Sequence, residues 1–208
     1  MSSNHHLDSN AAFKMDEGAT LGANRSGGLR LKCRERIDNP FALARGEARP
    51  TRPLKFVPAE GRVPHDFIGT TNASVHLVSA KLQDVLDEHG FTGWTTFPVM
   101  VIDDDGAELP GYAGLAVTGR CGPIDDRLSE RITLPPHFGG GPERRGLRGI
   151  YFRPDSWDGS DLFAPKDSAS VYVVERVKDA LAAAGVTNVQ FERLSEFERT
   201  WRANGTPL

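Results

Sequence analysis

Two short stretches hold residue types that could catalyse a reaction. His65 is followed directly by Asp66, and a carboxylate can orient an imidazole that titrates near neutral pH. Neighbouring side chains on an extended backbone point to opposite sides, so this pair is interpreted as part of a surface loop. Cys121 follows Arg120, a cation that would lower the pKa of the thiol, and His137 lies further along the chain. The surrounding residues match no catalytic signature, so we predict no catalytic residue. The alternative is a small cytoplasmic hydrolase or transferase that uses Cys121 or a histidine.

An acidic turn around a tryptophan is the candidate for a partner contact. Carboxylates recur at every third position around Trp157. Their order does not match a calcium-binding loop, so we predict no metal site. Tryptophan is a frequent anchor of binding surfaces. The predicted partner-binding residues are Asp155, Trp157, Asp158 and Asp161.

Two stretches with a superficial likeness to phosphate-binding segments are interpreted as solvated. Residues 139–146 are rich in glycine and arginine but lack the Gly-Lys-Ser/Thr ending of a phosphate-binding loop. The first third of the chain is rich in arginine, but it has few aromatic residues that could stack on bases, and its acidic residues offset the charge. We therefore predict no cofactor and no nucleic-acid partner.

The segments around these residues contain one pattern twice. Residues 74–97 and 173–191 each hold a β-branched run, a basic residue, an aspartate, a leucine, a glycine and a threonine, at an offset of roughly 95 residues. The matching pairs are Lys81 and Arg176, Asp84 and Asp179, Leu86 and Leu181, Gly90 and Gly185, and Thr92 and Thr187. In each copy the apolar periodicity predicts a strand, a helix that ends at the glycine, and a second strand.

The recurring pattern predicts an α+β (mixed α/β) fold built from duplicated strand-helix-strand units. The two units cover about residues 74–101 and 170–194. Short amphipathic helices are not stable alone, so each helix must lie on a sheet. We expect one compact body or two pseudo-symmetric lobes.

The rest of the chain is predicted to hold long connections. Residues 1–28 contain few large apolar side chains and are predicted to form a flexible leader. Residues 29–208 are predicted to form a single α+β domain with the internal repeat. Residues 133–149 hold prolines and a triple glycine, which predict a flexible loop or a connection between lobes. A Ser-x-x-Glu capping box that starts at Ser195 predicts a short terminal helix.

Composition and charge narrow the class of protein. A chain of 208 residues can bury a core without disulfides or metals, and a net charge of −3 implies no charged partner by itself. Cys33 and Cys121 are too few for a disulfide framework, and the first residues lack the apolar segment of a secretory signal. No window is apolar over the length that spans a bilayer. We expect a soluble, cytoplasmic protein without a membrane partner; the sequence leaves the oligomeric state open.

Several segments together resemble a bacterial protein family. They are PLKF at 53–56, PHDF at 64–67, VSAKLQDVL at 78–86, GWTTFPV at 93–99 and GVTNVQFERL at 185–194. They are similar to a domain class found among the immunity proteins of polymorphic and contact-delivered toxin systems, over a span of roughly residues 53–198. The resemblance implies a non-enzymatic protein that binds and neutralises a cognate protein toxin. It implies no catalytic residue.

Overall fold

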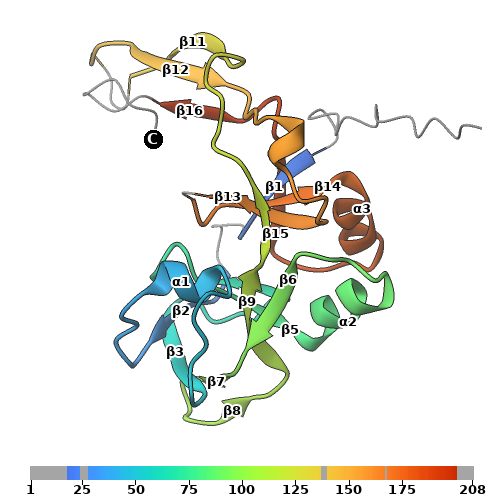
Figure 1. The fold of residues 1–208 in the computed structure, drawn as a ribbon. Coiled ribbons are helices and arrows are strands. Elements are labelled where there is room, and N and C mark those ends of the chain that lie inside the picture. The colour runs from blue at the N-terminus through green and yellow to red at the C-terminus, as the bar shows by residue number, and fades with distance from the viewer. Residues whose placement is uncertain (1–17, 24–27, 137–139, 167, 201–208) are drawn as a thin grey trace, which may run out of the picture.

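The computed structural model describes residues 18–23, 28–136, 140–166 and 168–200. Strands hold 41% of these residues and helices 15%, and the strands form four sheets (Figure 1). The predicted α+β class with duplicated strand-helix-strand units is therefore wrong, because strands dominate and most of them lie outside the two predicted units. Many of these strands are held by pairing with distant segments, which a local pattern of side chains does not reveal.

The first of two central sheets is antiparallel and is followed by one of the helices. Its strands are β4 (Phe67–Gly69), β5 (His76–Ser79), β6 (Trp94–Phe97) and β9 (Tyr112–Val117), in the order β4-β5-β9-β6. Helix α2 (Ala80–Glu88) follows β5 directly. The hydroxyl of Ser79 accepts a hydrogen bond from the backbone N–H of Leu82 at 3.2 Å, which fixes the start of the helix. Gly90, with a φ of 63°, follows its end, where a side chain would be strained.

The second central sheet has five strands, and one of its inner strands precedes every other described element in the chain. The strands are β10 (Gly119–Cys121), β13 (Leu162–Pro165), β14 (Val171–Val174), β1 (Gly18–Ala23) and β15 (Val189–Arg193), in the order β10-β13-β14-β1-β15. Helix α3 (Glu175–Ala183) follows β14. Strand β1 pairs on both edges, with β14 and β15. Residues 18–23 therefore differ from the flexible leader predicted for residues 1–28, of which 1–17 and 24–27 lie outside the described residues.

The two central sheets share one order of strands. The order β4-β5-β9-β6 in the first sheet corresponds to β13-β14-β1-β15 in the second, with a helix after β5 and after β14. The strand in the third position comes from elsewhere in the chain, because β9 follows β6 whereas β1 precedes every other described element. A cut between β8 and β9 would therefore separate each central sheet from one of its strands.

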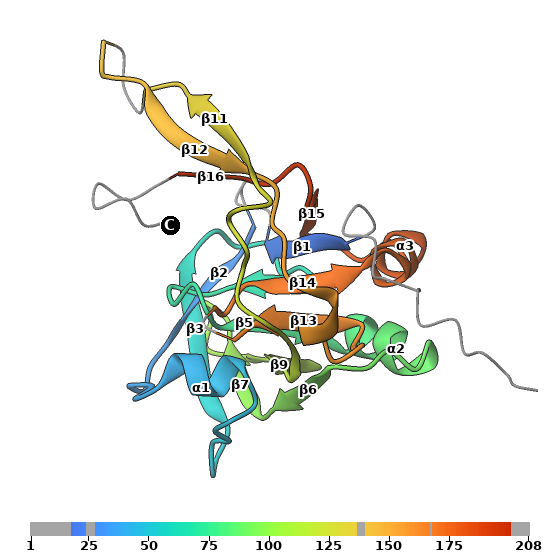
Figure 2. The ribbon, with the colours of Figure 1, turned by 45° about the horizontal axis from the view of Figure 1, so that its top comes forward.

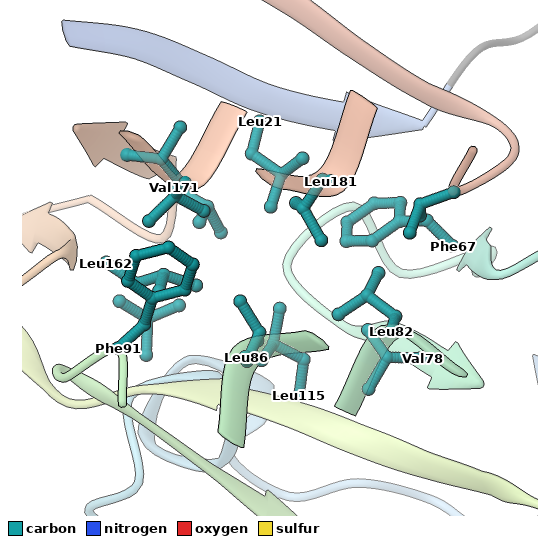
Figure 3. Packing of buried hydrophobic residues seen from close by; sticks show 14 of the residues in the cluster. Leu21, Phe67, Val78, Leu82, Leu86, Phe91, Leu115, Leu162, Val171 and Leu181 are labelled. Atoms are coloured by element: carbon teal, nitrogen blue, oxygen red, sulfur yellow. The ribbon is translucent and has the colours of Figure 1, made fainter. Parts of the chain in front are cut away.

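The main core lies between these two sheets and their helices (Figure 3). Leu82 and Leu86 of α2 and Leu181 of α3 point into the same space, and each is at most 1% exposed. Leu21 of β1 and Leu115 of β9 reach the same core from the two sheets. Full burial of one such side chain stabilises the fold by about 1.5–3 kcal/mol. The shared core makes the two sheets one packing unit.

A buried aspartate fastens the second central sheet to the first. Asp161, just before β13, is 2% exposed. Its carboxylate accepts hydrogen bonds from the backbone N–H and the hydroxyl of Thr92, at 2.9 and 3.0 Å, in the loop between α2 and β6. It also pairs with the guanidinium of Arg176 on α3, whose Nε donates at 2.7 Å. The Arg176 guanidinium in turn lies over the ring of Phe91, 5.4 Å from its centroid.

A second aspartate makes the corresponding connection in the other direction. Asp66, just before β4, accepts hydrogen bonds from the backbone N–H and hydroxyl of Thr187, at 2.8 and 2.9 Å, in the loop between α3 and β15. The hydroxyl of Ser79 donates to it at 2.7 Å, and Lys81 lies 3.6 Å away. Burial alone would raise the pKa of Asp66, but the hydrogen bonds from Thr187 and Ser79, together with the charge of Lys81, hold it below its ordinary value of 3.8.

A further four-stranded sheet packs beside the first central sheet. Its strands are β2 (Arg30–Cys33), β3 (Leu54–Glu60), β7 (Val99–Ile102) and β8 (Glu108–Leu109), in the order β2-β3-β7-β8. Phe56 and Phe97 belong to the core that joins the two sheets, and both are at most 3% exposed. The short helix α1 (Pro40–Ala44) connects β2 to β3. Its start is capped by Asn39, whose side chain accepts a hydrogen bond from the N–H of Ala42 at 3.0 Å.

Three strands form an arm that projects from the body of the protein (Figures 1 and 2). They are β11 (Glu130–Leu134), β12 (Arg144–Arg148) and β16 (Glu198–Thr200), with β12 in the middle. The predicted flexible loop over residues 133–149 is thus wrong for residues 133–134 of β11 and 144–148 of β12. The terminal helix predicted from Ser195 is wrong as well, because residues 198–200 pair with β12, and this pairing overrides the local capping signal. Among the described residues, none of the helices has the length and apolar character that crossing a membrane requires.

Candidate functional site

A cleft of about 860 Å³ lies where the arm meets the second central sheet. We call it the arm cleft. Its floor consists of residues of β1, β14 and β15. One wall consists of the N-terminal part of α1 and the segment that leads into β5, and another consists of residues at the root of the arm. Side chains alternate between the two faces of a strand, so the floor carries the residues of β1 that face away from the main core. The cleft thus draws on segments that are far apart in the sequence.

The floor of the arm cleft has a gap at a glycine. Thr20 of β1 lies opposite Tyr172 of β14 on one side and opposite Glu192 of β15 on the other, so the three side chains form one row across the sheet. In the next row Gly22 lies opposite Gln190. A Cβ atom at Gly22 would meet no other atom within 4 Å. The glycine therefore leaves open space in the middle of the floor.

The root of the arm is held by a buried arginine that lines the cleft. Arg199 of β16 is 8% exposed. Its Nη2 donates to the hydroxyl of Ser129 at 3.0 Å and to the carbonyl of Gly149 at 3.4 Å, and it lies 2.7 Å from Oδ1 of Asp126. The contact between Arg199 and Asp126 is an ion pair without hydrogen-bond geometry, because Oδ1 of Asp126 has no hydrogen-bond partner. Removing one partner of such a pair leaves a buried charge uncompensated, so the pair fixes the arm to the body.

The wall of the arm cleft opposite the arm carries a partly exposed aromatic ring. Phe41 of α1 is 40% exposed and is one of the large apolar side chains that the fold leaves open to solvent. His76 of β5 lines the same wall and stacks on Phe67, with the ring centroids 5.0 Å apart. Burial lowers the pKa of His76 to about 4, so its imidazole is neutral at neutral pH. The charges that line the cleft are therefore those of Asp126, Glu192 and Arg199.

The four predicted partner-binding residues do not form one exposed patch. Asp161 is buried and serves the junction with Thr92 and Arg176 described above. Trp157 is half-buried: its indole N–H donates to the carbonyl of Ser160 at 3.2 Å, and its ring packs on Phe163 with centroids 5.5 Å apart. Both residues therefore have structural contacts that account for them.

The other two predicted residues are exposed. Asp158 accepts hydrogen bonds from the backbone N–H of Arg120 at 2.7 Å and from that of Ser160 at 3.0 Å. Asp155 is paired with Arg153, two positions earlier in the chain. A contact of Asp155, Trp157, Asp158 and Asp161 with a partner stays a prediction.

Neither arrangement considered for catalysis is assembled in the described part of the chain. Cys121 is 2% exposed, and burial together with the nearby Asp158 raises the pKa of its thiol to about 12, outweighing the opposite effect of Arg120. The thiol is therefore protonated at neutral pH and is a poor nucleophile. His137 lies outside the described residues. The carboxylate of Asp66 is committed to Thr187 and Ser79, and the described residues hold no cluster of three or more His, Cys, Asp or Glu side chains that could bind a metal ion.

The comparison with known families identifies the class of protein. A model of an immunity protein family matches residues 15–196, which is most of the chain and includes β1 and the floor of the arm cleft. The chain is therefore a member of an immunity protein family, as the resemblance in the sequence predicted, and this points to a role in neutralising toxins. The family to which it belongs is Imm11. None of the curated proteins matches the sequence.

The residues of the arm cleft were not predicted from the sequence. The pair Asn39-Pro40 is a helix-start signal that could have placed Phe41 on a short helix. Gly22 and Arg199 carried no usable signal, because their roles depend on the pairing of β1 with β14 and β15 and of β16 with β12. Such long-range pairings had to be seen in the structure.

Proposed function

We propose that this immunity protein binds one cognate protein toxin through the arm cleft and neutralises it by occlusion, without catalysis. The observation that carries the proposal is the match to an immunity protein family over residues 15–196, a span that contains β1 and the cleft floor. The protonated, buried thiol of Cys121 supports a role in binding rather than in nucleophilic catalysis.

The arm cleft is the part of the described surface best suited to this role. Its volume of about 860 Å³ lies in the range of concave sites that bind ligands with high burial. Phe41, Ile124 and Phe197 supply apolar lining, and Phe41 is open to solvent. A partly exposed aromatic ring in a concave site is the kind of residue that dominates binding energy in interfaces.

We also propose that the protein acts in the cytoplasm. Cys33 and Cys121 are both free thiols, as is usual in a reducing compartment. Fractionation of cells that express a tagged chain from its own promoter tests this, and recovery of the chain in the periplasmic or secreted fraction would contradict it.

The test of the function starts from the toxin encoded beside the gene. Co-expression of the chain should restore growth to cells that produce the toxin, and the purified proteins should bind in calorimetry. Replacing the anchor, Phe41→Ala, should weaken binding by about tenfold or more. Leu128→Ala is the matched control, because Leu128 is 59% exposed but does not line the cleft. Failure to bind or rescue against every neighbouring toxin would refute the proposal.

A further inference from the structure

We infer that the arm cleft receives a lysine or arginine side chain from a loop of the toxin, with its aliphatic stem over Gly22 and its charged head beside Glu192. This inference rests on the proposed function and names the chemistry of the partner at the same site. It follows from the shape of the floor, from the balance of charges in the cleft and from the apolar character of its walls.

The shape of the floor calls for an inserted side chain. Gly22 leaves a gap between the neighbouring strands, and a Cβ atom there would touch nothing within 4 Å. Gln190 of β15 and Ser170, which directly precedes β14, line the cleft beside it. Gly22 pairs with Gln190 of β15, and the preceding Leu21 pairs with both β14 and β15, so the backbone beneath the gap is held in place and the hollow persists without a ligand. A long, unbranched side chain from a partner fits such a slot.

The charges that line the arm cleft favour a cation. Two carboxylates, Asp126 and Glu192, share the cleft with one cation, Arg199. The Arg199 guanidinium is already committed to Asp126, at 2.7 Å, and to the arm root. Among the described residues Glu192 forms no ion pair. Burial and then the charges of Glu198 and Glu196 raise its pKa, against the opposite effect of a backbone hydrogen bond from Glu198. The two neighbouring carboxylates make the surroundings of Glu192 acidic. His76 is neutral at neutral pH and does not offset this charge.

The walls determine which kind of cation fits. Phe41, Ile124 and Phe197 place apolar surface between the mouth of the cleft and its floor. Lysine and arginine bury an apolar stem while the charged head reaches a polar partner, so both parts of the side chain find a matching surface. An acidic side chain would meet the like charge of Glu192, and a purely apolar one would desolvate that carboxylate without a partner.

The experiment uses the full chain and the toxin encoded beside its gene, with two variants that change the cleft differently. Gly22→Val fills the gap and should weaken toxin binding by about tenfold or more. Because Gly22 has no positive φ and valine is favoured in strands, the thermal midpoint of unfolding should equal that of the unaltered chain. Glu192→Gln keeps the shape and removes the charge, which should weaken binding by about tenfold at low salt and less at high salt. Glu88→Gln, an exposed carboxylate at the end of α2 and outside the cleft, is the matched control and should bind like the unaltered chain.

A charge exchange identifies the partner residue. Glu192→Lys should abolish rescue, and a toxin in which one lysine or arginine is replaced by glutamate should regain binding to this variant only. If the unaltered chain binds the toxin and Glu192→Gln and Gly22→Val bind equally well, the inference is overturned while the proposed function stands. If the unaltered chain binds no toxin, the proposed function itself fails and the inference with it. If light scattering shows a dimer that Gly22→Val separates, the occupant is a second copy of the chain, which also overturns the inference.

Discussion

Replacing Asp161 by asparagine is the sharpest test of how the two central sheets are held together. The side chain is 2% exposed, and its two oxygens serve different partners. Oδ2 accepts two hydrogen bonds from Thr92, and Oδ1 accepts one from Nε of Arg176. Asp161→Asn keeps the size and shape of the side chain, so it removes the charge and one acceptor without opening a cavity.

The structure sets the size of the effect. An asparagine whose oxygen faces Thr92 turns its NH₂ group toward Arg176, so that hydrogen bond is lost and the two from Thr92 become bonds to a neutral acceptor. Hydrogen bonds to a charged group contribute about 1.5–3 kcal/mol each, and neutral ones about 1. The side chain of Arg176 is 65% exposed and regains water, which limits the loss. We expect a decrease of about 2–3 kcal/mol in the free energy of unfolding.

Thermal and urea unfolding followed by circular dichroism measure this decrease. For a chain of this size 1 kcal/mol shifts the midpoint by roughly 2–4 °C, so Asp161→Asn should unfold roughly 4–12 °C lower. Asp155→Asn is the matched control, since Asp155 is exposed and paired only with the exposed Arg153; its midpoint should not change. A midpoint for Asp161→Asn equal to that of the unaltered chain, or an equal decrease for Asp155→Asn, would show that the junction does not carry the stability assigned to it.

Three more predictions concern substitutions of single residues. Asp66→Asn should flatten the loss of stability in acid. Because folding lowers the pKa of Asp66, the contribution of this residue to the free energy of unfolding is complete above its ordinary pKa of 3.8 and is lost as the pH falls through the lower folded value. Urea titrations between pH 5 and 2 that show no difference between variant and parent would contradict this. Gly93→Ala should prevent stable folding, because its φ is 85° and a Cβ atom would lie 2.0 Å from the carbonyl oxygen of Leu162. Gly90→Ala, in open space with a φ of 63°, should lower the free energy of unfolding in urea by only about 1 kcal/mol. An equal decrease for both variants would show that the close approach at Gly93 is not real. Cys121, with a buried thiol whose pKa is raised to about 12, should react with Ellman's reagent at pH 8 only after unfolding, measured in a Cys33→Ser background because Cys33 is a partly exposed free thiol. Cys121→Ala should rescue cells from the toxin like the parent. Rapid labelling of Cys121 in the native protein, or loss of rescue in the folded variant, would count against this.

Local signals in the sequence located the two long helices and failed for much of the sheet structure. Apolar spacing and the two glycines predicted α2 and α3, which end two residues before Gly90 and Gly185. The spacing was informative because the buried residues Leu82, Leu86, Val177 and Leu181 lie on one side of each helix. The fold class was nevertheless wrong. Strand β12 consists of Arg-Arg-Gly-Leu-Arg, which has no strong strand propensity of its own, and it exists because β11 and β16 pair with it on either side.

The candidate site was beyond the reach of local signals for a related reason. The sequence pointed to the aspartates around Trp157, but it could not show that Asp161 would be buried against Thr92, which lies 69 positions earlier in the chain. Spacing alone does not distinguish an exposed carboxylate from one that holds two sheets together. The family resemblance, by contrast, needed no geometry, and it was confirmed.

Strand β1 connects the stability of the fold to the proposed binding site, and its two faces can be tested separately. Ala19 belongs to the main core, is 3% exposed and does not line the arm cleft, whereas Gly22 lies on the floor of the cleft. Ala19→Gly should lower the free energy of unfolding by about 1–2 kcal/mol while the folded molecules keep their affinity for the toxin. Gly22→Val should do the reverse, weakening the affinity at an unchanged midpoint of unfolding. Unfolding curves and calorimetry on both variants separate the two effects, and a variant of one face that changes both quantities equally would show that core and cleft are coupled through the strand.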